Sequence, residues 1–111
     1  MKLLKFLIII VTMVLLLYSC AGKSYKSEFD FANNLAKKGL WKEAYMRWQK
    51  ILDSGKESAV LYNNIAIALE KMGKPEEAEK AYKKALKLSP NSSRIKSNYD
   101  RLKKFLEMSE E

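Results

Sequence analysis

Residues 59–92 read AVLYNNIAIALEKMGKPEEAEKAYKKALKLSPNS, and this stretch carries the clearest structural pattern in the chain. Its first half places apolar residues at helical spacing, and Gly73 follows where a helix C-terminus favours a left-handed residue. Its second half opens with Pro75, which the first turn of a helix tolerates, and Pro90 follows its end. The stretch therefore predicts two short helices joined at Gly73.

The same pattern occurs once before, because the chain repeats itself with a period of 34 residues. Shifting the sequence by this period aligns Ala32, Leu35, Lys37, Gly39, Glu43, Ala44, Lys50 and Leu52 with Ala66, Leu69, Lys71, Gly73, Glu77, Ala78, Lys84 and Leu86. Trp48 also falls on Tyr82, and Phe31 falls on Ile65. A fixed period of this length is typical of stacked helical repeats. We therefore expect two units, residues 25–58 and 59–92, with the helices of the first near residues 25–38 and 41–53.

The second unit resembles a tetratricopeptide repeat over its full length. The positions that fit the family pattern are Tyr62, Ile65, Ala66, Leu69, Gly73, Ala78, Tyr82, Ala85 and Pro90. The first unit keeps Phe31, Ala32, Leu35, Gly39, Ala44 and Trp48. It has Glu28, Ile51 and Lys56 where the pattern has a large apolar residue, a small residue and Pro, so it resembles a degenerate repeat.

The alanines of the pattern explain how such helices pack. We expect Ala32, Ala66, Ala78 and Ala85 to let helices approach closely, while large aromatic residues fill the space between them. Trp41, Tyr45, Trp48 and Tyr82 form an aromatic set at helical spacing, which favours core packing over a ligand cage.

The remaining residues, 93–111, predict one more helix and a short tail. Ile95, Tyr99, Leu102 and Leu106 recur at helical spacing, so this helix is expected to cover the open apolar face of the second unit. The predicted fold is all-α: two helix-turn-helix repeats and a C-terminal capping helix, which together make a short α-solenoid.

Residues 1–19 have the features of a secretory signal. Lys2 and Lys5 precede an apolar run over residues 6–18, which is shorter than the roughly 20 residues of a transmembrane helix. Residues 17–20 read LYSC and resemble a bacterial lipobox. The resemblance implies cleavage before Cys20, a covalent lipid on the Cys20 sulfur, and a short polar tether over residues 20–27. An uncleaved signal anchor and an unmodified thiol are the alternatives.

These features predict a lipid-anchored protein of the bacterial cell envelope. Ala21 follows Cys20 where an Asp would favour retention in the inner membrane, so the outer membrane is the favoured location. Without Lys2 and Lys5, 19 basic and 13 acidic side chains remain, a net charge of +6 that is spread along the chain.

The composition argues against several functional classes. The chain has no His and a single Cys, so the common general base, a Cys/His nucleophile and the usual zinc ligand sets are missing. We expect no enzyme activity, no metal, no small-molecule substrate and no cofactor besides the lipid on Cys20. We do not expect nucleic acid as a partner, because the chain is expected to be exported and its lysines have the spacing of a solvated helix face.

The resemblance implies that partner proteins bind in a concave groove lined by the first helix of each repeat. By position, the groove residues are Phe29, Asn33, Lys37, Asn63, Asn64, Ile67 and Lys71, with Arg94 and Asn98 at the edge. Some family members hold a terminal carboxylate with a five-residue clamp. Asn33 and Asn64 match that clamp, and Arg94 keeps its charge. Phe29 and Asn98 do not fit, so a complete clamp is not expected.

The sequence therefore predicts a membrane-anchored scaffold that docks other envelope proteins during the assembly of envelope complexes. An accessory role in outer-membrane β-barrel assembly is preferred over a role in assembling type IV pilus secretins. The alternative from another class is a structural basic domain that binds anionic envelope polymer or lipid headgroups.

Overall fold

The computed structural model describes the backbone of residues 1–110, and it describes the side chains of all of these except residues 20–23. The described part contains five helices and no strand. They are α1 (Lys2–Lys37), α2 (Trp41–Asp53), α3 (Ala59–Lys71), α4 (Pro75–Leu88) and α5 (Ser93–Ser109). The all-α prediction is confirmed.

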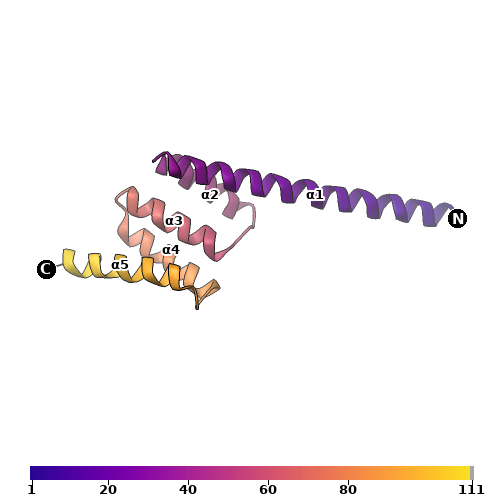
Figure 1. Cartoon of the computed structure of the whole chain (residues 1–111). Helices are drawn as coiled ribbons and strands as arrows, with labels where there is room; N and C mark the ends of the chain where they lie inside the picture. Colours follow the sequence, from indigo (N-terminus) through magenta and orange to yellow (C-terminus); the bar gives the residue numbers. More distant parts are fainter. Residues whose placement is uncertain (111) are drawn as a thin grey trace.

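Each helix packs against the next one along the chain, from α1 with α2 through to α4 with α5. Successive helices run in opposite directions and stack as a short row, with the N-terminal part of α1 projecting beyond it (Figure 1). This arrangement is the short α-solenoid that the 34-residue period predicts, with α5 as the last helix. The C-terminal part of α1 pairs with α2, and α3 pairs with α4.

The core is built from the small and aromatic residues of the repeat. Ala32, Ala44, Ala66, Ala78 and Ala85 are completely buried, because a methyl group is all that fits where neighbouring helices cross. Trp48 and Tyr82 are also buried, which confirms their predicted place in the core. Tyr45 and Trp41 pack against this cluster and are half-buried.

Gly73 ends α3 as expected, with a left-handed φ of 75°. Its N–H donates to the carbonyl of Glu70 at 3.0 Å, and the N–H of Lys74 donates to the carbonyl of Leu69 at 2.9 Å. These two bonds satisfy carbonyls that a helix end otherwise leaves without partners. The end of α1 at Gly39, the equivalent position one period earlier, has the same pair of bonds.

The N-termini of α3 and α5 are capped by serines that the pattern did not single out. The Ser58 hydroxyl accepts a hydrogen bond from the N–H of Leu61 at 3.1 Å, and the Ser92 hydroxyl accepts one from the N–H of Ile95 at 3.4 Å. Each cap satisfies one unpaired N–H of a first helical turn.

Helix α1 differs from the expected division of the N-terminal region. It runs without interruption from Lys2 to Lys37, so the segment expected to be a tether, residues 20–27, belongs to a continuous helix. A segment without Pro between two helical stretches can extend their hydrogen-bond ladder without a new nucleation step. The first repeat is therefore attached to the apolar segment by a helix and not by an extended linker.

The apolar residues before position 19 lie on the projecting part of α1 and are exposed. By length and composition this helix is able to cross a membrane, a property that an N-terminal signal sequence shares. The predicted lipid attachment falls on Cys20, whose side chain lies outside the described residues.

Candidate functional site

A hollow of about 460 Å³ lies between α1 and α3. It is lined by Phe29, Asn33, Ala36, Lys37, Trp41, Trp48, Val60, Asn64, Ile67 and Arg94. Six of the nine residues predicted for the groove and its edge are among them, from three different helices: Phe29, Asn33, Lys37, Asn64, Ile67 and Arg94. The structure thus brings together residues that were assigned to the groove from their positions in the repeat pattern.

Two amides join the two sides of this hollow. The Asn64 side chain donates to the Asn33 side-chain oxygen at 3.3 Å, which links α3 to α1. A side-chain amide has two donor hydrogens and an oxygen with two lone pairs, so one shared bond leaves capacity on both groups. Both side chains are half-buried. They are therefore placed to bond a peptide backbone that lies along the hollow.

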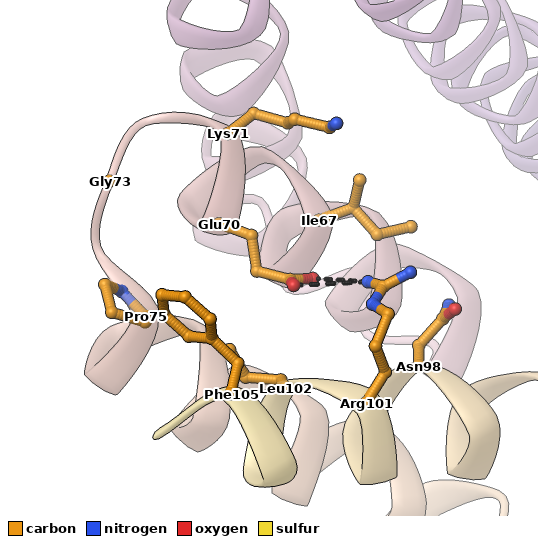
Figure 2. Close-up of a pocket in the computed structure, with 9 residues that line it drawn as sticks. All are labelled: Ile67, Glu70, Lys71, Gly73, Pro75, Asn98, Arg101, Leu102 and Phe105. Atoms are coloured by element: carbon orange, nitrogen blue, oxygen red, sulfur yellow. Dashed lines mark hydrogen bonds and ion pairs between the residues drawn. The ribbon is translucent and has the colours of Figure 1, made fainter. Parts of the chain in front are cut away.

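A second hollow, of about 650 Å³, lies between α3 and α5. In Figure 2, Ile67, Glu70 and Lys71 approach it from α3, whereas Asn98, Arg101, Leu102 and Phe105 approach it from α5. Ile67 lines both hollows, so they adjoin on the same face of α3. We call the two hollows together the groove.

Glu70 and Arg101 form the main polar contact of the second hollow. One Arg101 nitrogen donates to both Glu70 carboxylate oxygens, at 3.0 and 3.2 Å (Figure 2). The same carboxylate accepts a hydrogen bond from the buried Tyr82 hydroxyl. Burial, together with the bond to Glu70, raises the pKa of Tyr82 well above its ordinary value of 10.0. The Glu70 charge is thus compensated inside the protein.

The remaining charged side chains of the groove are basic. Lys37 and Arg94 line the first hollow and Lys71 lines the second, so cations are spread along its length. The Lys71 ammonium lies 6.0 Å from the centre of the Trp41 ring, a distance at which the ring face attracts a cation. With Glu70 paired to Arg101, the groove combines an apolar floor with a basic rim.

Asn63 was predicted to lie in the groove, but it lines neither of the two hollows. It is only 2% exposed, and its side-chain oxygen accepts a hydrogen bond from the Asn98 amide at 3.0 Å. Consecutive residues are about 100° apart around a helix, so Asn63 faces the α3–α5 contact while Asn64 faces α1. Asn63 therefore joins helices and is not available to a ligand. Lys71, predicted for the same groove, lines the second hollow and not the first.

Sequence reasoning missed Glu70, Arg101 and Phe105. Apart from Arg94 and Asn98 at the groove edge, the sequence pattern predicts the C-terminal helix as a cover, with its apolar stripe at Ile95, Tyr99, Leu102 and Leu106. Phe105 lies beside that stripe and stays 58% exposed. An aromatic residue next to a completed apolar stripe was the available signal.

The indole ring of Trp48 lies at the first hollow with its N–H unpaired among the described residues. Its ring is 2% exposed and contributes to the lining of the first hollow, yet its Nε1–H has no hydrogen-bond partner among the described residues.

Within the described part of the chain, no cluster of His, Cys, Asp or Glu is suited to hold a metal ion.

The repeat geometry agrees with a comparison against protein families. Residues 59–92 match the tetratricopeptide repeat family. The matched tetratricopeptide repeat consists of α3, α4 and the turns that bound them. A comparison with curated proteins found no match. Tetratricopeptide repeats are in general protein-interaction modules without enzymatic activity, so the match supports a protein–protein interaction scaffold.

Proposed function

We propose that this protein is a membrane-anchored scaffold that holds a segment of another envelope protein in the groove. The observation that carries the proposal is the convergence of α1, α3 and α5 on one surface with an apolar floor, bonding amides and a basic rim. Pockets that bind ligands typically combine a mostly apolar lining with a few polar groups that fix orientation.

Each part of the groove has a distinct role in this proposal. Phe29, Val60 and Ile67 receive apolar side chains of the partner, and burial of that surface supplies most of the affinity. Asn33 and Asn64 bond the partner's backbone and set its register. Phe29 occupies a position where a carboxylate clamp needs a cation, so recognition does not depend on a terminal carboxylate.

For the anchor, we propose the lipid-modified form. The LYSC pattern at the end of the apolar run supports cleavage before Cys20 and lipid attachment there. Several acyl chains hold a protein on a bilayer, whereas a single chain binds only marginally. The intact mass of the protein extracted from membranes tests this step. Loss of residues 1–19 with an added acyl mass supports the lipid anchor, and retention of Met1 shows that the apolar part of α1 remains as the anchor.

Within the envelope, the proposed role is the assembly of protein complexes. Outer-membrane β-barrel assembly is the preferred setting, and assembly of type IV pilus secretins is the second. The support for either is the combination of a helical-repeat groove with the export and membrane attachment that the N-terminal sequence predicts.

The experiment that tests the function is crosslinking in cells followed by purification from solubilised membranes and mass spectrometry. A double variant, Asn33→Ala with Ile67→Ala, removes one polar and one apolar contact of the groove. Its matched control is Asn34→Ala with Met46→Ala, two exposed positions that do not line the groove.

Recovery of a barrel or secretin component with the wild type and the control, but not with the groove variant, supports the proposal. Equal recovery with both double variants contradicts the assignment of the groove. Recovery of lipid or wall polymer alone contradicts the scaffold function.

A further inference from the structure

The anchoring end of the protein contains a third hollow that the scaffold function does not use. It lies between the start of the repeat part of α1 and the end of α2, and its volume is about 400 Å³. It is lined by Ser24, Tyr25, Glu28, Arg47, Lys50, Ile51, Ser54 and Lys56. Three of these side chains are basic and one is acidic, so the lining is positively charged.

The position of this anchor-side hollow relative to a membrane follows from the continuity of α1. The apolar run ends at Tyr18, and Ser24 comes six residues later on the same helix. At 1.5 Å per residue this separation is about 9 Å. The polar layer on each side of a bilayer is roughly 5 to 8 Å thick. If α1 anchors the chain, the hollow is therefore at the level of the lipid headgroups or just outside it.

Both forms of the anchor lead to this placement. Ser24 is four residues beyond Cys20, so a lipid on Cys20 and an uncleaved apolar helix each bring the hollow to the bilayer surface. The turn after α2, which carries Lys56, lies on the same side of the stacked helices as the projecting part of α1 (Figure 1).

The charges of the anchor-side hollow are arranged to meet an anion. Arg47 donates to Glu28 at 3.3 Å, and its guanidinium lies 5.0 Å from the centre of the Phe31 ring, so two contacts hold it in place. Lys50 and Lys56 form no ion pair with the described residues. Lys50 also stabilises the negative end of the α2 dipole, but Lys56 lies beyond that helix and is not needed for it.

We propose that this hollow binds the phosphate of an anionic phospholipid headgroup in the membrane that anchors the chain. Lys50 and Lys56 supply the charge, and the Ser24 hydroxyl supplies a hydrogen-bond donor. The inference rests on the anchoring step of the proposed function and is independent of the groove. Its consequence is an orientation: the α1–α2 end faces the bilayer, and the turns at Gly39 and Gly73 face away from it.

Lipid binding to the full chain in detergent micelles tests the proposal by native mass spectrometry. Phosphatidylglycerol and phosphatidylcholine are titrated separately, and the wild type is expected to bind the anionic lipid more tightly. The double variant Lys50→Gln with Lys56→Gln should lose roughly 5-fold in phosphatidylglycerol affinity for each lysine removed and keep its affinity for phosphatidylcholine. The matched control, Lys42→Gln with Lys80→Gln, makes the same change in charge at exposed positions outside the hollow and should behave like the wild type.

Equal losses in the two double variants would show a net-charge effect and overturn the site. Competition by glycerol phosphate at concentrations near that of the lipid would identify a free phosphate ligand and overturn the lipid assignment. Flotation with phosphatidylglycerol vesicles distinguishes a failure of the proposed anchor from a failure of the proposed headgroup site. If the wild-type chain does not float, the anchoring step fails and this inference fails with it. If it floats but both variants keep full lipid affinity, only the headgroup site fails.

Discussion

Replacing Tyr82 by Phe removes one buried hydroxyl and keeps the aromatic ring in the core. Tyr82 is completely buried, and its hydroxyl donates to the Glu70 carboxylate. Hydrogen bonds to charged groups contribute about 1.5 to 3 kcal/mol to stability. Because Glu70 keeps its two bonds to Arg101, the carboxylate is not left alone, so we expect the lower end of that range, about 1.5 to 2 kcal/mol.

Thermal unfolding of the full chain in detergent, followed by the fluorescence of Trp41 and Trp48, measures this loss. For a domain of this size, the expected decrease in the unfolding temperature is about 6 to 16 °C. Tyr45→Phe is the matched control, because Tyr45 is half-buried and its hydroxyl bonds no described side chain. The control should change the free energy of unfolding by less than about 0.5 kcal/mol. Equal unfolding temperatures for the two variants would refute the role of the Tyr82–Glu70 bond.

The same pair of residues predicts a pH dependence. The folded-state pKa of Tyr82 is raised above 10.0, so its contribution to stability is complete below pH 10 and is lost as the pH rises beyond that value. Tyr62, bonded to Glu57, also has a raised pKa and contributes in the same direction. Between pH 9 and 11 the wild type should therefore lose more stability than Tyr82→Phe, which has one such group fewer. Parallel pH profiles would contradict the assignment.

Three further substitutions test single features of the fold in chemical denaturation of the full chain. Gly73→Ala should lose about 1 kcal/mol because φ is 75° there, although a Cβ meets no atom within 4 Å; unchanged stability would argue against the left-handed helix end. Trp48→Phe should lose less than about 1.5 kcal/mol because it removes an unpartnered N–H, whereas Trp48→Ala should lose about 3 to 5 kcal/mol. Similar losses in both would indicate that the indole N–H has a partner. Ser92→Ala should lose about 1 kcal/mol of capping energy, and Ser93→Ala, one residue inside the helix, should not; a reversed order would place the cap elsewhere.

Much of the helical architecture follows from local patterns that a sequence displays directly. The 34-residue period, the glycines at positions 39 and 73 and the alanines at helix crossings each depend on spacing along one or two helices. For that reason the helix pairs and the buried Trp48 and Tyr82 could be predicted before any packing was known. Eight of the nine residues expected at the groove and its edge line one of the two hollows.

The neighbouring residues Asn63 and Asn64 show what only the tertiary structure decided. Both are amides on α3, but Asn63 is buried and bonds Asn98 of α5, while Asn64 faces α1 across the first hollow. Glu70 and Arg101 meet although they are 31 positions apart, a contact that depends on where α5 lies against α3. The periodicity of a helix determines which residues share a face, and the packing of helices distant in sequence determines what that face meets.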